Sequence, residues 1–507
     1  MNKSTLIPND GRGWRNRRWC RVALVASLLG SIAGLLLWFA TKGFPVPDGD
    51  SIYYYPVMLD RAAGHGFSNH FSGFVQNFDP TGEGRLVYHG YLYPLLVGSL
   101  AWKPGYAAIE IVVAAFQIVS LVICAYWFWL AQRDTPWAGT VWGDCLFVTA
   151  TLAGATIISG QAGRAETIGV PIITAGAILL YTLPFRWHWL FCGVAVGLLA
   201  AAHPIGSLMA GLLVAMYGFF RLYFWPALRF ILAAAALALV TWAMTFWAYP
   251  FSLSEWVGGL LANGKNVLPS PTAGPDSSLL YRWILQPSAT CYGCLYLFGG
   301  CALVFYYRRY AALIRSRLAF ALCAIPVAFA IYNYGFRVPV QNYNLLLFAP
   351  LVLALIVRFC SSTGHWVLRL TAIALFGLAS MGFGQKVLLF PWFLREGLSR
   401  DLAGQRLADI RREFPGPVAI SGGLFTLVDR YDGIEEFHDG SHAATLVMQQ
   451  AYRGPGPAPI MPGYRLVRSY FCPIIPRLFG LPVAHSVQGY NFALYRRIDL
   501  ERSDTKR

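Results

Sequence analysis

The segment from Trp14 to Pro56 indicates the architecture of the chain and reads WRNRRWCRVALVASLLGSIAGLLLWFATKGFPVPDGDSIYYYP. It begins with a basic cluster and continues into a mostly apolar segment, residues 21–41. Because about 20 apolar residues in a helix cross the hydrocarbon of a bilayer, this segment predicts a spanning helix. It is too long for the core of a cleavable signal peptide, so we expect an uncleaved signal anchor. Two acids, Asp48 and Asp50, then follow where the helix should leave the membrane.

The composition of the whole chain supports a membrane protein. Of its 507 residues, 56% are hydrophobic and only 13% are charged, about half of the ~25% found in soluble domains. The net charge of +16 suggests nucleic acid at first sight. The basic residues are spread over short loops, however, and are not gathered on one polar domain, which argues against nucleic-acid binding.

Apolar segments recur along the chain and predict about eleven spanning helices. Two of them are short and are separated by His203-Pro204, so they are candidates for a broken or re-entrant pair, which a bilayer tolerates where neighbouring protein satisfies the backbone. The expected segments are 21–41, 106–131, 139–159, 163–184, 188–202, 205–220, 228–248, 288–307, 317–333, 342–358 and 365–385.

The distribution of arginines predicts the orientation. A basic tail, residues 1–20, keeps the N-terminus cytoplasmic, and alternation of eleven spans then leaves short basic loops inside. Three longer pieces face outward: the first long loop (42–105), the second long loop (249–287) and the tail (386–507). We expect a multi-pass protein of the bacterial inner membrane, with its C-terminus in the periplasm.

The tail is more polar than the rest and predicts a small α/β domain. The sequence LAGQRLADIRREF (402–414) has helical spacing, and GPVAIS (416–421) and NFALYRRI (491–498) have the pattern of strands. Gly422-Gly423 follows the first strand, as a weak phosphate-loop signal or as a plain strand-to-helix turn. The expected fold is therefore a polytopic α-helical membrane protein with a small C-terminal extramembrane α/β domain.

The first long loop opens with a short amphipathic helix. Pro56 suits the first turn of a helix, and Gly64 suits the position just after its end. Such a helix would lie on the membrane surface, with Ile52, Tyr55 and Leu59 on its apolar face. Asp50, at its N-terminal end, is either a helix cap or a chemically active group.

Several motifs, in this order, resemble the GT-C superfamily of membrane glycosyltransferases. The branch most similar contains the protein O-mannosyltransferases and the aminoarabinose transferase of lipid A. The first long loop contributes an acid before a tyrosine (DSIYYYP), then GHGF, then an aromatic-proline run (YHGYLYPLLVGSL). Later pieces are GQAGRAETIGV, GLLAAAHPIG and RVPVQNYNLLLFAPLVLAL. The resemblance covers about residues 20–360, and Ser51 replaces the second acid of the commonest loop pattern.

This resemblance implies an enzyme that moves a sugar from a polyprenyl-phosphate donor to a lipid, glycan or protein acceptor. It implies a helical fold of the same kind and a loop acid at the acceptor. Asp50 matches that acid, and Asp48 is the alternative. An acceptor hydroxyl needs a base as it attacks the sugar, and a departing phosphate needs cations. Candidates for the phosphate and substrate site are Arg164, Glu166, His203, Arg337, Arg282, Lys265, His89 and Tyr53.

Other readings stay open at this point. Each candidate also has a structural explanation, such as an interfacial anchor for Arg164 or a packed ring for His203. A divalent metal is a further alternative, held by His65, His70 and His89 or by the Asp48-Gly49-Asp50 motif. At the level of function, the alternatives are a transporter or flippase for lipid-linked sugars, a polysaccharide polymerase and a non-catalytic membrane scaffold.

Overall fold

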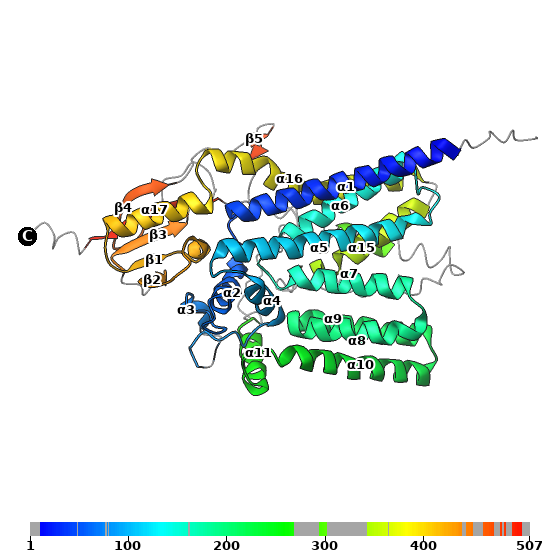
Figure 1. Cartoon of the computed structure of the whole chain (residues 1–507), viewed down its shortest axis with the longest axis horizontal. Helices are drawn as coiled ribbons and strands as arrows, with labels where there is room; N and C mark the ends of the chain where they lie inside the picture. Colours follow the sequence, from blue (N-terminus) through cyan, green and yellow to red (C-terminus); the bar gives the residue numbers. More distant parts are fainter. Residues whose placement is uncertain are drawn as a thin grey trace, which may run out of the picture.

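The fold is a bundle of long helices with a small mixed sheet packed at one end (Figure 1). We describe it from a computed structural model, which covers residues 11–47, 49–76, 79, 81–160, 163–267, 294–301, 342–362, 365–438, 443–449, 460–470, 477–478, 481–482 and 489–498. The first long loop lies at the same end of the bundle as the sheet, as the predicted topology requires.

Most of the predicted spanning segments are helices. Six described helices are long and apolar enough to cross a membrane, and three more are shorter apolar helices. The expected segments 288–307 and 317–333 lie largely outside the described residues. The described helices of the bundle are α1 (Gly11–Lys42), α5 (Tyr106–Arg133), α6 (Val141–Gly160), α7 (Glu166–Thr182), α8 (His188–Ala202), α9 (Pro204–Arg221), α10 (Phe224–Phe246), α15 (Asn342–Ser362) and α16 (Trp366–Arg395).

The last helix of the bundle is longer than the sequence suggests. The apolar run predicts an end near residue 385, whereas α16 continues to Arg395. The extra turns pack Leu389, Phe390 and Phe393 into the core, where the Phe390 ring lies 4.8 Å from that of Phe39 on α1. Burial of these side chains explains the extension.

Two glycines bring α8 and α10 close together. A Cβ on Gly193 would lie 2.7 Å from the carbonyl oxygen of Ala234, and one on Gly197 would lie 2.7 Å from Cβ of Thr241. Lipid gives helices little hydrophobic reason to associate, so small residues four apart promote contact by allowing the backbones to approach. The helices α8, α9 and α10 lie side by side in the bundle (Figure 1).

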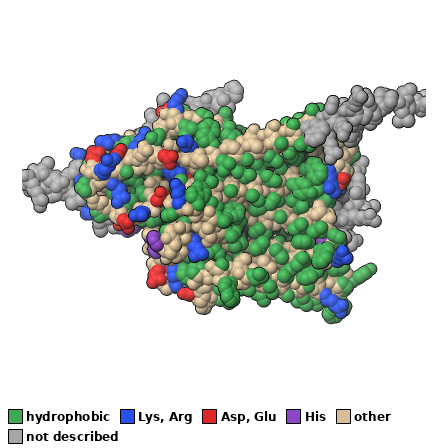
Figure 2. Space-filling model, viewed as in Figure 1, with side chains coloured by type: hydrophobic (Ala, Val, Ile, Leu, Met, Phe, Trp, Pro, Cys, Tyr) green, Lys and Arg blue, Asp and Glu red, His purple; other side chains and the backbone are tan. Residues whose placement is uncertain are grey.

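The surface matches a membrane-embedded bundle. Figure 2 shows mostly hydrophobic side chains over the long helices, whereas charged side chains gather at the sheet end and at the opposite end of the helices. Exposed apolar side chains occur on several bundle helices, among them Leu239 and Met244 of α10. Such a band between two charged ends is what a bilayer requires.

The C-terminal domain is a five-stranded mixed sheet behind a helix. Its helix is α17 (Arg400–Glu413), and its strands are β1 (Val418–Ile420), β2 (Ile434–Glu436), β3 (Thr445–Gln449), β4 (Tyr464–Tyr470) and β7 (Phe492–Arg497), in the spatial order β2-β1-β3-β7-β4. The strand β1 pairs in parallel with β2 and β3, whereas β7 pairs antiparallel with β3 and β4. A separate hairpin joins β5 (Arg477–Leu478) and β6 (Leu481–Pro482). The predicted helix and both predicted strands are confirmed.

Gly422-Gly423 forms a strand-to-helix turn. The two residues begin the 3-10 helix η5 (Gly422–Leu427). A Cβ on Gly422 would lie 3.0 Å from the carboxylate of Glu436, and Gly423 lies against the side-chain amide of Gln449. A carboxylate next to this turn is unsuitable for a phosphate, and the prediction of a plain strand-to-helix turn is confirmed.

The first long loop contains four short helices: η1 (Gly49–Tyr53), α2 (Tyr55–Ala62), α3 (Gly73–Gln76) and α4 (Leu92–Leu100). The predicted helix at Pro56 is therefore confirmed, and Gly64 follows it with φ +74°. The predicted position of this helix on the membrane surface is wrong, because all residues from Tyr55 to Asp60 are buried within the protein. The N-cap of α2 is Tyr54, which makes no side-chain cap hydrogen bond. The interpretation of Asp50 as the cap of this helix is wrong, because Asp50 belongs to the preceding helix η1.

The first long loop and the C-terminal domain share one apolar core. The Phe425 ring of η5 lies 6.0 Å from the ring of Tyr55 and 6.1 Å from that of Phe71, and Phe71 lies 4.9 Å from Tyr431. Since these aromatic rings come from segments more than 350 residues apart in the sequence, burial of the rings fixes the domain on the loop.

Polar contacts also fasten the domain to the membrane helices. Asp429 accepts a hydrogen bond from the backbone N–H of Tyr106 at 2.8 Å and so caps α5. Arg400 of α17 forms a buried ion pair with Glu110 of α5. At the loop, Ser72 donates to Glu436 at 2.6 Å. The carboxyl edge of the parallel strands is therefore held against the first long loop.

Candidate functional site

Glu166 lies at the centre of a buried polar cluster. Glu166 is the first residue of α7, at the same end of the bundle as the first long loop, and is only 4% exposed. One carboxylate oxygen lies 3.5 Å from Nε of Arg164, and the other lies 3.6 Å from Nε2 of His203. An acidic group at a helix N-terminus is also stabilised by the helix dipole.

His203 is aimed at Glu166 by the break between two helices. The helix α8 ends at Ala202 and α9 begins at Pro204, with His203 as the N-cap. Its Nδ1 accepts a hydrogen bond from the backbone N–H of Gly206 at 3.0 Å. In neutral His203 the proton therefore resides on Nε2, the atom facing the Glu166 carboxylate.

His89 approaches the cluster from the first long loop. Its neighbour Gly90 lies directly against the carbonyl of Ala202, in a contact that leaves no room for a Cβ. The His89 ring lies 5.1 Å from the ring of Tyr53 and 5.5 Å from that of Tyr54. Burial, reinforced by the proximity of His203, lowers the pKa of His89 to about 4. His89 is therefore a neutral hydrogen-bonding group at pH 7.

The helix that carries Asp50 packs against the residue that precedes Arg164. Gly163 has φ +80°, and a Cβ there would lie 2.8 Å from both Cβ of Ser51 and Cε1 of Tyr55. Asp50 is the second residue of η1, directly before Ser51. The backbone of Asp50 is thus held beside the polar cluster.

Replacing Gly163 by alanine should destabilise this junction. The left-handed backbone disfavours any side chain, and the new Cβ collides with Ser51 and Tyr55, so we expect a loss of about 1–3 kcal/mol. Thermal unfolding of the purified protein in nanodiscs would measure it. The matched control is Gly160→Ala, since a Cβ at Gly160 meets nothing within 4 Å. Equal unfolding temperatures for the two variants would contradict this close approach.

Sequence reasoning missed Asn69, which shapes the loop around η1. Its side chain is fully buried, and its Nδ2 donates to the carbonyl of Ile52 at 2.6 Å. Its Oδ1 accepts from the backbone N–H groups of Phe71 and Ser72 at 3.1 and 3.0 Å. The signal was an asparagine inside the Gly- and Ser-rich run GHGFSNHFSG, where a side chain often replaces backbone partners.

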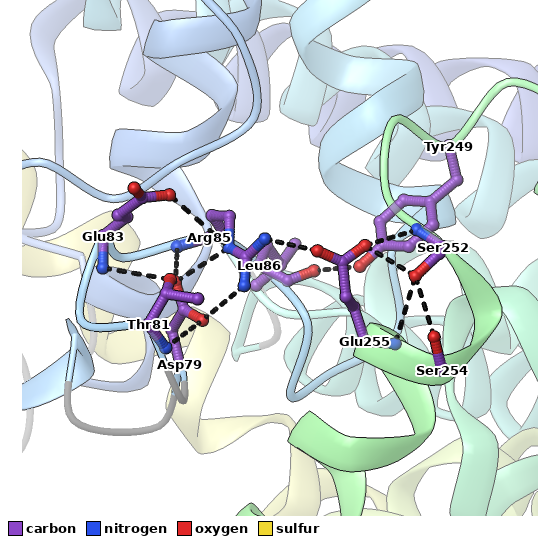
Figure 3. A network of polar contacts seen from close by, with 9 residues as sticks. All are labelled: Asp79, Thr81, Glu83, Arg85, Leu86, Tyr249, Ser252, Ser254 and Glu255. Atoms are coloured by element: carbon purple, nitrogen blue, oxygen red, sulfur yellow. Dashed lines mark hydrogen bonds and ion pairs between the residues drawn. The ribbon is translucent and has the colours of Figure 1, made fainter.

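A second polar network braces the same loop. Arg85 binds the carboxylate of Asp79 through Nε and Nη2, both at 3.1 Å, and also pairs with Glu255 from the second long loop (Figure 3). Burial raises the pKa of Asp79, but hydrogen bonds from Arg85 and Thr81 outweigh it and lower the pKa to about 2. Asp79 therefore stabilises the loop in its ionised form.

Acid should weaken the loop through Asp79. A carboxyl whose pKa is lowered on folding stabilises the protein above its ordinary pKa, and this stabilisation is lost as the pH falls from about 5 to 2. We expect Asp79→Asn to have a lower unfolding temperature than the wild type at pH 6. Between pH 6 and pH 3, the unfolding temperature of the variant should fall less than that of the wild type. Glu83→Gln is the control, because Glu83 is an exposed carboxylate of the same loop whose contact with Arg85 is longer, at 3.8 Å (Figure 3). An unchanged pH dependence in Asp79→Asn would contradict the prediction.

Comparison with known proteins identifies the fold. No family model matches the sequence, and no curated protein matches it. The crystal structure of ArnT from Cupriavidus metallidurans in the apo state aligns with 94% of this chain and 98% of its own, at 12% identity and a TM-score of 0.51. The chain has the fold of ArnT. A structure of ArnT bound to undecaprenyl phosphate aligns with 84% of this chain and 93% of its own, at 12% identity and a TM-score of 0.32.

The predicted resemblance to the aminoarabinose transferase branch of GT-C enzymes is thus confirmed for the fold. Within this ArnT-like fold, five sequence-predicted candidates lie in one neighbourhood: Arg164, Glu166, His203, His89 and Tyr53. The described residues do not include Asp48, Arg282 or Arg337, nor the side chains of Asp50 and Lys265. The roles of all these residues stay predictions.

His70 of the first long loop pairs with a different carboxylate. His70 lies 3.4 Å from the carboxylate of Asp60, whose other oxygen accepts from the backbone N–H of Ser68. Hydrogen bonding to Asp60 raises the pKa of His70. Among the described residues, no group of three or more His, Cys, Asp or Glu side chains is placed to hold a metal ion.

The neighbourhood combines groups suited to an anionic substrate at the membrane edge. Arg164 carries a permanent charge, which its planar guanidinium can direct to a phosphate. Tyr53 and His89 add a partly apolar wall with hydrogen-bonding groups. A phosphate beside His89 would raise the pKa of its ring, because an opposite charge favours the protonated form. The arrangement therefore has the charge and the hydrogen-bonding groups that a phosphate site requires, next to the backbone that carries Asp50.

Proposed function

We propose that this protein is a membrane glycosyltransferase that moves a sugar from a polyprenyl-phosphate donor to a lipid, glycan or protein acceptor on the outer face of the membrane. One observation carries the proposal: Arg164, Glu166, His203 and His89 converge beside η1, the helix of Asp50. The ArnT-like fold supports it, and ArnT itself has been crystallised with undecaprenyl phosphate, a lipid of the class that such a donor would release.

The reaction is a single displacement with inversion. Asp50, or Asp48 in its place, accepts the proton of the acceptor hydroxyl as that oxygen attacks C1 of the sugar. The bond between C1 and the phosphate oxygen breaks, and the phosphate leaves with its electron pair. Arg164 and His89, together with Arg282, Arg337 or Lys265, stabilise the negative charge that develops on it.

Glu166 and His203 orient the phosphate site. Glu166 lies 3.5 Å from Nε of Arg164 and 3.6 Å from Nε2 of His203, and this pairing holds the Arg164 side chain in one direction, which lowers the entropy lost when the phosphate binds. Tyr53 adds a ring against which the sugar or the first isoprene unit packs. No divalent metal is needed for this mechanism, although one bound by the acids of the first long loop is compatible with it.

The test is a transfer assay with a panel of radiolabelled polyprenyl-phosphate sugars. Membranes containing the protein, and matched membranes without it, are offered each donor in parallel, and label leaving the donor is followed. We expect transfer from one donor, with the anomeric configuration inverted in the product. Absence of transfer from every donor would overturn the proposal, and movement of an intact labelled donor between leaflets would favour a flippase.

A further inference from the structure

The segment that leads to His89 is held from outside by one helix of the second long loop. This helix is α11 (Leu253–Val267). Asn263 donates from Nδ2 to the carbonyl of Tyr88 at 3.0 Å, and Trp256 donates from Nε1 to the carbonyl of His89 at 3.0 Å. Just before the helix, the hydroxyl of Tyr249 donates to the carbonyl of Leu86 (Figure 3). Three carbonyls of the segment 86–89 thus receive side-chain donors from the second long loop.

The contact between α11 and this segment is close enough to require a glycine. A Cβ on Gly259 would lie 2.6 Å from Cγ2 of Val87 and equally close to the carbonyl group of Val87. Val87 and Tyr88 are fully buried, and Trp256 is 7% exposed. A buried carbonyl that loses its hydrogen-bond donor is left unsatisfied, which destabilises the fold. The helix is therefore a required partner of the segment.

An ion pair joins the first turn of α11 to the first long loop. Glu255 accepts at 2.7 Å from both the backbone N–H and the hydroxyl of Ser252, while Ser252 accepts from the backbone N–H of Glu255 (Figure 3). This reciprocal pattern is a capping box. The same carboxylate pairs with Arg85, one residue before the held segment. One glutamate thus starts the helix and ties it to the loop.

The opposite face of α11 is apolar and exposed. Leu253, Val257 and Leu261 recur at intervals of four residues and are 49%, 42% and 65% exposed. Their spacing places them on one side of the helix, away from Asn263 and Gly259. The helix therefore has one face that binds the His89 segment and another that suits the lipid surface beside the bundle.

We propose that α11 is a positioning element that fixes the backbone of His89 and thereby directs its imidazole toward the phosphate of the substrate. The inference rests on the proposed function, because it assigns the second long loop a role in that same site. Trp256, Asn263 and Gly259 are positioning residues in this account, since they act through His89 and touch no reacting atom.

A double variant, Trp256→Phe with Asn263→Leu, tests the proposal. It removes both donors and retains aromatic and aliphatic bulk. The matched control is Leu261→Ala, on the outward face of the same helix. Two quantities are measured on full-length protein in nanodiscs: amide hydrogen exchange of a peptide covering residues 85–91, and the kcat and KM for sugar transfer.

We expect exchange in that peptide to become at least ~10-fold faster in the double variant, and kcat to fall about 10-fold with a smaller change in KM. The control should match the wild type in both. Unchanged exchange and a kcat within about twofold of wild type would overturn the inference. If wild-type protein transfers no sugar, the proposed function fails, and the exchange measurement still decides whether α11 holds the segment.

Discussion

Asparagine in place of Asp50 is expected to reduce sugar transfer by about 10²- to 10⁴-fold, the usual contribution of a general base. Asparagine has nearly the same shape as aspartate but cannot accept the proton of the acceptor hydroxyl. The backbone of residue 50 lies in η1, which packs through Ser51 against Gly163, so the substitution should leave the fold intact. Transfer is measured as initial rate at saturating donor, with protein amounts matched by immunoblot.

The comparison variant is Asp48→Asn. Asp48 lies one residue before η1 and is the alternative base. If Asp50 is the base, Asp48→Asn should retain most of the activity and Asp50→Asn should lose it. The reverse result would transfer the role to Asp48. Full activity in both variants would remove the loop acids from the chemistry and direct attention to Glu166, the buried carboxylate between Arg164 and His203.

Breaking the ion pair between Arg400 and Glu110 is expected to cause the largest loss of stability. Their side chains are 7% and 8% exposed, so Arg400→Leu would leave the Glu110 carboxylate buried without its partner. Removing one member of a buried pair typically costs about 3–5 kcal/mol. We expect a marked fall in unfolding temperature, measured in nanodiscs, and early proteolysis of the C-terminal domain.

The double variant Arg400→Leu with Glu110→Leu is the decisive control. Replacing both charged residues by apolar ones removes the cost of desolvating the charges as well as their attraction. Such a double replacement often leaves the free energy of unfolding unchanged. The double variant should therefore unfold at a higher temperature than Arg400→Leu alone. If the single variant loses less than about 1 kcal/mol, the pair does not hold the domain on α5, and the shared aromatic core around Phe425 does so together with the Asp429 and Ser72 hydrogen bonds.

Local signals in the sequence predicted most individual elements. Apolar runs located the bundle helices because crossing a bilayer requires about 20 such residues whatever lies beside them. Pro56 and Gly64 marked the ends of α2, and His203-Pro204 marked the break between α8 and α9. Each of these signals depends on backbone geometry within a few residues. The local rule failed at Asp50, where η1 intervenes before α2.

The sequence predicted individual residues of the candidate site but not their arrangement. Arg164, Glu166, His203 and His89 were each predicted by type and position, but their mutual geometry depends on how α7, α8 and the first long loop pack. Close contacts at Gly90 and Gly163 make that packing possible. The presence of a glycine in a loop does not predict which segment will pack against it. Asn69 was missed for the same reason, since its partners follow from the folded loop.

Sequence patterns were sufficient to predict the membrane character of the chain, the order of its helices, two strands of its terminal domain and the residue types available for chemistry. Three contacts became evident only in the folded chain: Asp429 caps α5, Arg400 pairs with Glu110, and α11 contacts the segment that leads to His89. These contacts join residues roughly 170 to 320 positions apart. Their partners are selected by burial and by the need to satisfy buried polar groups, which exist only once the chain has folded.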